Sequence, residues 1–318
     1  MKRLPVDWFL RIRLKLRHLQ LFLALDDHRN LHRAAASLHI SQPAASKLLG
    51  EVEEMLDVRL FERLPRGVEP NTYGEILIRH ARMILSQLAQ AGEEIESLNR
   101  GDSGVTSIGT VNAPAVELVA PAVERVHRLQ PRLQINVQVD TSDVLAQRVL
   151  DGKLDFALAR IPVDFDPAAF FYDEISDEKL CFICRAGHPL LAREAVTLSD
   201  LDGHSWVLQP RGTLLRRKID EMFRSRAQPL PERVITTASV MVTMAVVGKT
   251  DALSVIPVAV AALYRSPGRY AVLPFAEPFA VEPFGVLRLK DRALSPGALT
   301  LLRAIGAIAW PGRAALVR

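Results

Sequence analysis

The residues best equipped to bind another molecule are gathered in one short stretch, "SQPAASKLLG" (Ser41–Gly50). Glutamine and serine side chains can hydrogen-bond base edges or a phosphate backbone, and lysine neutralises phosphate. The stretch therefore predicts contact with a nucleic acid, whereas the alternative is the polar face of an ordinary helical bundle. With two earlier residues, the predicted contact set is Asn30, Arg33, Ser41, Gln42, Pro43, Ser46, Lys47 and Gly50.

Two arginines extend this basic and polar surface. Arg63 and Arg66 lie in "RLFERLPRGVEP", where Pro65 and Gly67 indicate a turn between two short strands. A hairpin with two arginines beside a polar helix predicts a wing against a DNA backbone. Residues 1–33 contain eight Lys/Arg and three Asp, which permits a polyanionic partner, although a solvated helix face would have the same composition.

Other reactive residue types lack the spacing that catalysis or metal binding requires. Cys181 and Cys184 form a Cys-x-x-Cys within a run typical of a buried strand, and no second ligand pair follows, so buried thiols are favoured over zinc or redox chemistry. The eight histidines include no HExxH motif. The segments "GTLLRRK" and "DGKLD" lack the glycines of a phosphate loop. We therefore expect no catalytic residue, metal or cofactor, and an enzyme is the weaker interpretation.

The polar stretch needs a helix to position it. Ser41 predicts an N-cap, and Pro43 fits the first turn. Shorter helices are expected before it, at residues 16–27 and 31–39, the second capped by Asn30. The inward face of the third helix consists of Ala45, Leu48, Leu49, Val52 and Leu56. Two helices joined by a tight turn, the second with this polar start, predict a helix-turn-helix.

A long amphipathic helix is expected to follow the hairpin, capped by Asn71 or Thr72 and ending near Leu98. Its single apolar stripe, without a core of its own, predicts dimerisation through paired helices. "NRGDSG" (Asn99–Gly104) predicts a linker.

From Val105 the pattern changes to alternating strands and helices, which predicts an open, mostly parallel sheet with helices on its faces. The expected strands are Ser107–Val111, Gln134–Val139, Asp155–Ala159, Lys179–Cys184, Ser205–Leu208 and Ala252–Val255. The expected helices are Val116–Leu129, Val144–Leu150, Leu214–Arg226, Val240–Val247 and Pro257–Leu263. Such sheets bind ligands at the carboxyl ends of their strands.

These segments resemble the LysR-type transcriptional regulators. The stretch from about Leu16 to Glu75 contains the phrases Ser-Gln-Pro-Ala-Ala-Ser and Leu-Phe-Glu-Arg, and "LDGKLDFALARIP", "RAGHPL" and "LQPRGTLLR" are similar to phrases of the family's C-terminal domain. The resemblance implies an α/β protein with a winged helix-turn-helix, a linker helix and a two-lobed effector domain like periplasmic binding proteins. Within the family it is nearest to the branch that regulates sugar-binding protein genes.

The sequence departs from the family pattern in three places, one of them a pair of adjacent residues. Asp57 stands where glycine is usual after the recognition helix and must tolerate a left-handed backbone. Gly50 replaces a more usual polar residue on the groove-facing side, so a base contact could be lost there. Pro70 and Asn71 replace a common Leu-Thr, although asparagine caps a helix as well as threonine does.

The resulting domain expectation has three parts. Residues 1–71 form the DNA-binding domain with an N-terminal extension, residues 72–104 the dimerisation helix and hinge, and residues 105–318 the effector domain. Within the effector domain, residues 105–177 and 281–318 form the first lobe, and residues 178–280 form the second.

The family's effector contacts lie on loops at strand ends between the lobes. Arg160 is predicted to anchor an anion, with an ion pair bridging the lobes as its alternative, and the hydroxyl residues could instead cap helices. The predicted effector-binding residues are Asn112, Ala113, Pro114, Thr141, Ser142, Arg160, Thr213 and Ser239. The predicted ligand is a small polar metabolite, either a sugar derivative or an organic acid.

The function that these observations predict is a sequence-specific DNA-binding regulator controlled by that effector. Its expected partners are a double-stranded operator, the effector, RNA polymerase if it activates, and further copies of itself in a dimer or, as the resemblance implies, a tetramer. The N-terminus lacks the features of a signal peptide and no apolar run could span a membrane, so a cytoplasmic location is expected. A binding module with a degenerate DNA-facing half remains the alternative.

Overall fold

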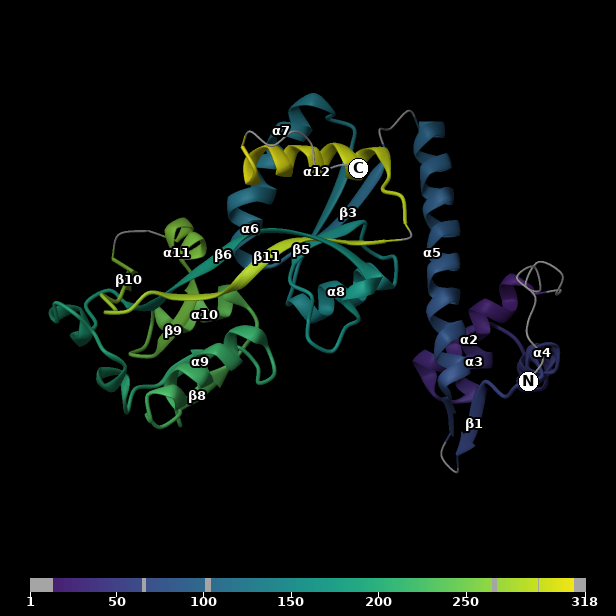
Figure 1. The fold of residues 1–318 in the computed structure, drawn as a ribbon, viewed down its shortest axis with the longest axis horizontal. Helices are drawn as coiled ribbons and strands as arrows, with labels where there is room; N and C mark the ends of the chain where they lie inside the picture. The colour runs from purple at the N-terminus through teal and green to yellow at the C-terminus, as the bar shows by residue number, and fades with distance from the viewer. Residues whose placement is uncertain (1–13, 65–66, 101–103, 265–267, 291, 312–318) are drawn as a thin grey trace. The chain divides into compact units, whose positions relative to one another are not determined.

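The computed structural model describes residues 14–64, 67–100, 104–264, 268–290 and 292–311. The chain divides into two compact units (Figure 1), one formed by Met1–Asp102 with Leu150–Lys153 and the other by Ser103–Val149 with Leu154–Arg318. Within the described ranges, every helix is too short or too polar to cross a lipid bilayer.

Three helices begin the first unit: α2 (Leu16–His28), α3 (Leu31–Ser37) and α4 (Gln42–Leu56). Both predicted caps are confirmed, because Asn30 accepts a hydrogen bond from the Arg33 N–H and the Ser41 hydroxyl accepts one from the Ala44 N–H. The second helix is shorter than predicted because His39 takes a left-handed backbone conformation with φ 54°. Asp57 has the left-handed conformation that its position demands, also with φ 54°.

The hairpin consists of β1 (Phe61–Leu64) and β2 (Gly67–Pro70), which pair antiparallel. Glu53 on α4 fixes its start, because the carboxylate accepts hydrogen bonds from the N–H of Leu60 at 2.8 Å and of Phe61 at 3.4 Å. Gly67 has φ +151°, and a Cβ there would lie 2.3 Å from the carbonyl oxygen of Arg29. Glycine is therefore required for the return strand to pack against the end of α2.

The long helix α5 (Thr72–Arg100) is capped by Asn71, whose side chain accepts hydrogen bonds from the Tyr73 and Gly74 N–H groups. Its buried residues Ile78 and Ala81 pack against the core that α2, α3 and α4 share. A second face leaves large apolar side chains exposed: Tyr73, Ile76, Ile84, Leu88 and Ile95.

The first half of the second unit contains the parallel strands β3 (Val105–Thr110), β4 (Gln134–Val139) and β5 (Phe156–Ala159). Three consecutive helical segments follow β3: α6 (Asn112–Pro114), a π-helical turn (Ala115–Val119) and α7 (Ala120–Leu129). This segment begins earlier than the predicted Val116, since a proline is tolerated in a first turn. As Figure 1 shows, α7 and α12 (Pro296–Ala309) cover one face of the strands, and α8 (Ser142–Leu150) lies on the other.

The second half contains the parallel strands β7 (Trp206–Leu208), β8 (Val234–Thr236) and β9 (Leu253–Pro257). Its helices are α9 (Leu214–Ser225), α10 (Val240–Val247) and α11 (Val258–Leu263). Short 3-10 turns occur at Pro167–Ala169, Pro189–Ala192 and Leu198–Leu201. Trp206 and Phe182 are fully buried in the core of this half.

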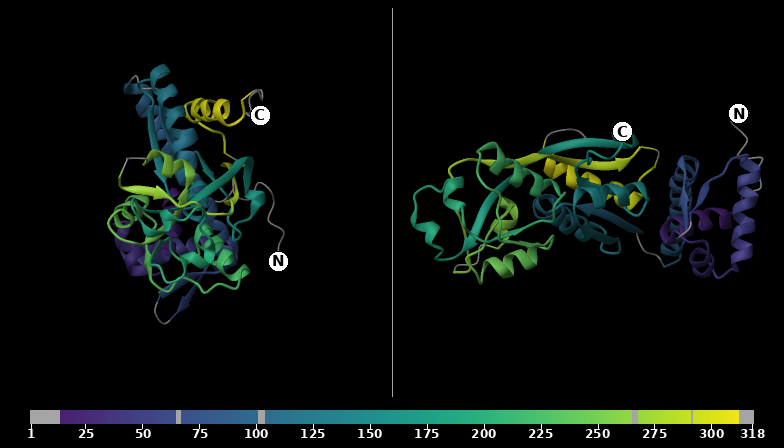
Figure 2. Two further views of the ribbon diagram at one scale, coloured as in Figure 1. Left: turned by 90° about the vertical axis from the view of Figure 1, so that its left-hand side faces the viewer. Right: turned by 90° about the horizontal axis from the view of Figure 1, so that it is seen from below.

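Two long strands cross between the halves and join them into one sheet, β6 (Phe170–Arg185) and β11 (Phe279–Leu289). They lie side by side in Figures 1 and 2 and pair antiparallel with each other. β6 also pairs antiparallel with β9 and with β10 (Tyr270–Val272), and β11 does so with β5. The prediction of a mostly parallel sheet was therefore wrong, because parallel pairing is confined to each half and the crossing strands run against it.

Candidate functional site

The polar start of α4 forms the first candidate surface. Gln42, Pro43, Lys47 and Gly50 are exposed and Ser46 is half-buried, while the opposite face of the helix is buried in the core of the first unit. A Cβ at Gly50 would meet nothing within 4 Å. Packing therefore does not require glycine at position 50, and its effect is that no side chain protrudes from the helix surface at that point.

The other residues predicted to contact DNA differ in exposure and in the contacts that they make within the protein. Arg33 is exposed. Asn30 and Ser41 cap α3 and α4, so the capping interpretation accounts for both side chains. Arg63 lies on β1, where only its backbone is described, and Arg66 lies outside the described residues.

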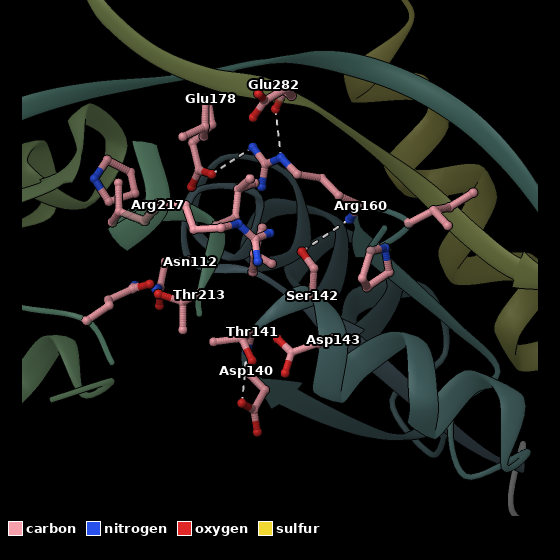
Figure 3. A pocket seen from close by; sticks show the side chains of 18 of the residues that line it. Asn112, Asp140, Thr141, Ser142, Asp143, Arg160, Glu178, Thr213, Arg217 and Glu282 are labelled. Atoms are coloured by element: carbon pink, nitrogen blue, oxygen red, sulfur yellow. Dashed lines mark hydrogen bonds and ion pairs between the residues drawn. The ribbon is translucent and has the colours of Figure 1, made fainter. Parts of the chain in front are cut away.

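The second candidate site is a cavity of about 940 Å³ between the two halves of the second unit. The structure brings together six of the eight residues predicted to bind an effector, and Figure 3 shows several of them around the space. They are Asn112, Thr141, Ser142, Arg160, Thr213 and Ser239. Ala113 and Pro114 do not line it, because they are buried within the helical segment that follows β3.

Arg160 has partners within the protein. Its side chain is almost fully buried, and Nη2 lies 2.9 Å from the carboxylate of Glu178 on β6. Nε donates a hydrogen bond of 2.7 Å to the backbone carbonyl of Glu282 on β11. Its own backbone N–H donates to the Ser142 hydroxyl. This is the ion-pair arrangement that was the alternative to an anion anchor, and it ties β5 to both crossing strands.

Carboxylates outnumber cations around the cavity, a surplus that was not predicted from the sequence. The lining acids are Asp140, Asp143, Asp164, Glu174, Glu178 and Glu282, whereas the lining cations are Arg160 and Arg217. A signal was present in the sequence, since Asp140 directly follows a predicted strand and Asp143 directly precedes a predicted helix. Both strand ends and helix starts face the site in a sheet of this kind.

Arg217 is the second functional candidate that was missed. It is exposed, lines the cavity and donates a 2.7 Å hydrogen bond to the carbonyl of Gly212. Figure 3 shows its side chain extending into the cavity. Most of its N–H donors therefore remain available to a ligand.

Two of the lining acids are held in place by neighbours. Lys218 lies 2.6 Å from the Glu282 carboxylate. Burial opposes ionisation of Glu282, but the hydrogen bond from Lys218 lowers the pKa of this carboxyl below its usual value. Asp140 accepts hydrogen bonds from the Thr141 N–H and from Gln138. Ionised carboxylates only accept hydrogen bonds, which suits these two side chains to bind hydroxyl groups.

The thiols and histidines that the structure describes do not form a metal or redox site. Cys184 packs in one core cluster and Cys181 against another, as expected for residues on opposite faces of a strand. Burial raises the pKa of each thiol to about 11, so both stay protonated at neutral pH. Among the described residues, no group of three or more His, Cys, Asp or Glu side chains could hold a metal ion.

Comparison with known proteins gives a consistent family for both units. Residues 16–75 match the family of bacterial regulatory helix-turn-helix proteins of the LysR type. Residues 99–309 match the LysR substrate binding domain. The chain is 55% identical over 306 residues to the HTH-type transcriptional regulator GbpR of Azospirillum brasilense, covering 96% of this chain and 90% of that protein. It is 42% identical over 239 residues to GbpR of Rhizobium radiobacter, covering 74% of this chain and 79% of that protein.

Solved structures agree on the fold. The chain resembles full-length CbnR complexed with its target DNA, with a TM-score of 0.62 at 22% identity and coverage of 93% and 100% of the two chains. It also resembles a full-length OxyR variant from Pseudomonas aeruginosa, with a TM-score of 0.58 at 22% identity and coverage of 94% of each chain. At this identity the likeness shows a shared fold.

Proposed function

Because this chain belongs to the LysR family of helix-turn-helix regulators, we propose that its cavity binds a small hydroxyl-rich effector and thereby controls how α4 and the β1–β2 wing act on an operator. The protein is a DNA-binding transcriptional regulator with a C-terminal effector-binding domain. The finer proposal concerns the chemistry of the effector, the contact residues and the assembly.

The charge of the cavity carries the effector proposal. Six lining carboxylates face two lining guanidiniums, and one of those guanidiniums is already paired with Glu178. An organic acid with two or more carboxylates would meet repulsion in such a site. A neutral sugar would not, since its hydroxyls can donate to carboxylates and accept from Arg217, Asn112 and the hydroxyl residues. Between the two ligand classes that the sequence predicts, the cavity favours the sugar.

The proposed contact residues follow from position. Asn112, Thr141, Ser142, Thr213 and Ser239 are the polar contacts from both halves, and Arg217 with the acidic residues joins them. Arg160 also lines the cavity, but its guanidinium is bonded to Glu178 and to the Glu282 carbonyl. Ser239 also caps α10 by accepting a hydrogen bond from Val242, so its hydroxyl donates to the ligand while its lone pair serves the helix.

We further propose the DNA contacts and the organisation of the chain. Gln42, Ser46 and Lys47 read or bind DNA at the start of α4, and Arg63 and Arg66 hold the backbone from the wing. Residues 1–71 are the DNA-binding domain, residues 72–104 the dimerisation helix and hinge, and residues 105–318 the effector domain. A regulator of chromosomal genes works in the cytoplasm, where its operator is, and needs no catalytic residue of its own.

Two measurements test this function. A melting-temperature panel with neutral aldoses, the matching uronic acids and dicarboxylates should show stabilisation by the aldoses, by about 2.7 kcal/mol at a ligand concentration 100 times the Kd. Stabilisation by dicarboxylates alone would reverse the ligand assignment.

The second measurement is a mobility-shift titration with the protein's own upstream DNA at several salt concentrations. Gln42→Ala should lower discrimination against random DNA by about 1–3 kcal/mol. Lys47→Ala should weaken both kinds of DNA and flatten the salt dependence. Equal binding of upstream and random DNA by the wild-type protein would support a degenerate DNA-binding half.

A further inference from the structure

The two crossing strands lose their register at one place. On β11, Val281 pairs with Glu178 and Phe284 pairs with Ser176, so Glu282 and Pro283 together face a single residue of β6. The next pair joins Gly285 to Glu174, which leaves an extra residue on β6 as well. Such bulges interrupt a ladder and bend the strands that contain them.

Two side chains, one from Arg160 at the end of β5 and one from Tyr172 on β6 itself, satisfy the carbonyl groups of this bulge. The Glu282 carbonyl accepts the 2.7 Å hydrogen bond from Arg160 Nε. The Pro283 carbonyl accepts a 3.1 Å hydrogen bond from the Tyr172 hydroxyl. Both donors line the cavity, as do the bulge residues themselves. The groups that complete the broken ladder are therefore within reach of a bound ligand.

The bulge also lies where one half of the unit gives way to the other. Towards one end β11 pairs with β5 of the first half, and towards the other end β6 pairs with β9 of the second. Arg160 reaches the bulge from the end of β5, and Lys218 of α9 holds the Glu282 side chain from the second half. A rotation of the halves must be taken up by these two strands, and a bulge is their weakest point.

We propose that the bulge at Glu282–Pro283 is the hinge between the halves, and that Arg160 and Tyr172 are positioning residues that couple occupancy of the cavity to it. A ligand oxygen that accepts a hydrogen bond from the Tyr172 hydroxyl deprives the Pro283 carbonyl of its partner. A ligand that draws the Arg160 guanidinium towards itself weakens the bond to Glu282. The coupling rests on the proposed function, because it requires an effector in this cavity, but the hinge itself does not.

The hinge is tested without ligand by hydrogen–deuterium exchange on the full-length protein. Tyr172→Phe removes one hydroxyl, and Arg160→Lys cannot keep both the Glu282 and Glu178 contacts. Loss of one such hydrogen bond should speed exchange about 5- to 10-fold in peptides spanning residues 174–179 and 281–286. The matched control is Tyr264→Phe, whose hydroxyl has no hydrogen-bond partner among the described residues and which should leave these peptides unchanged.

The outcomes separate the hinge from a merely structural role. Unchanged exchange in both variants, or a uniform increase across the whole second unit, would overturn the hinge.

For the coupling, the aldose that most raises the melting temperature should alter exchange in the two hinge peptides of the wild type, and Tyr172→Phe should reduce that response at least about threefold while binding persists. An aldose that binds without affecting these peptides would overturn the coupling and leave the effector class intact. If no aldose binds, the proposed effector class and the coupling both fail, and the exchange of the variants still decides the hinge.

Discussion

Arg216, Arg217 and Lys218 are consecutive in the chain, yet each has a different environment. Successive residues of an α-helix point about 100° apart, so three neighbours cannot share one face. Arg216 is buried and pairs with Asp220 at 2.9 Å, Arg217 enters the cavity, and Lys218 turns to Glu282. At the scale of the residue, the role of a charge here depends on which way its position on the helix faces.

The buried Arg160–Glu178 pair gives the first residue-scale prediction. Arg160→Met should lower the free energy of unfolding of the second unit by about 3–5 kcal/mol, because it leaves a buried carboxylate without its partner. The double variant with Glu178→Leu should recover most of that loss. Urea denaturation of the wild type, both single variants and the double variant measures the cycle, and equal destabilisation of Arg160→Met and the double variant would contradict the prediction.

Two buried histidines predict how stability depends on pH. Burial lowers the pKa of His18 despite the nearby Glu51 carboxylate, and burial lowers the pKa of His188 despite the backbone of Asp251 nearby. A histidine with a lowered pKa binds protons more readily in the unfolded chain. The melting temperature should therefore fall as pH drops from about 7.5 to about 5.5, starting near the ordinary histidine pKa of about 6.5. His18→Phe should reduce this slope, and an unaltered slope in that variant would assign the effect elsewhere.

At the scale of the element, close approach between β6 and β11 decides what can stand beside the bulge. A Cβ at Gly285 would lie 2.4 Å from the carbonyl oxygen of Asp173 and 2.8 Å from the Tyr172 ring. The tyrosine that supports Pro283 can therefore lie across the strand only because residue 285 has no side chain.

Gly285→Ala should consequently lower the free energy of unfolding by about 1–3 kcal/mol, because backbone and ring must move apart. Gly92→Ala is the matched control, since Gly92 is exposed within α5 and a Cβ there meets nothing within 4 Å. That change should be neutral or stabilising by up to about 1 kcal/mol. Thermal unfolding distinguishes the two, and an unaffected Gly285→Ala protein would show that the strands can separate freely at this point.

At the scale of the whole molecule, the exposed apolar face of α5 is unlike the rest of the first unit. Leu88 is 50% exposed and Ile95 is 61% exposed, whereas Leu85 packs against the core formed with α2. A helix-turn-helix regulator that binds an operator in this way places two recognition helices on successive turns of DNA, which requires at least a two-fold dimer. The α5 face supports the proposal of a dimer.

Leu88→Glu should therefore break the dimer and abolish operator binding while the effector domain remains folded. Leu85→Glu is a less informative choice because it would also disturb the unit's own core. Gln87→Glu places the same charge one residue away on an exposed polar position and should leave assembly intact. Light scattering at micromolar concentration measures the outcome, and a wild-type monomer there would contradict the proposal.

The sequence by itself determined the local features of this protein. The caps at Asn30 and Ser41, a cap at Asn71 or Thr72, the hairpin and the alternation of strands and helices were predicted because each depends on residues a few positions apart. Loop positions also predicted six cavity residues, since strand ends meet at one edge of a sheet.

Only the tertiary structure decided what those residues meet. Arg160 bonds to a carbonyl 122 positions away, and Tyr172 bonds to one 111 positions away. These contacts depend on two antiparallel strands that cross the unit, and no local pattern states that β11 returns beside β6 in a broken register. The surplus of carboxylates around the cavity has the same origin, because net charge belongs to a site only after the chain has brought distant residues together.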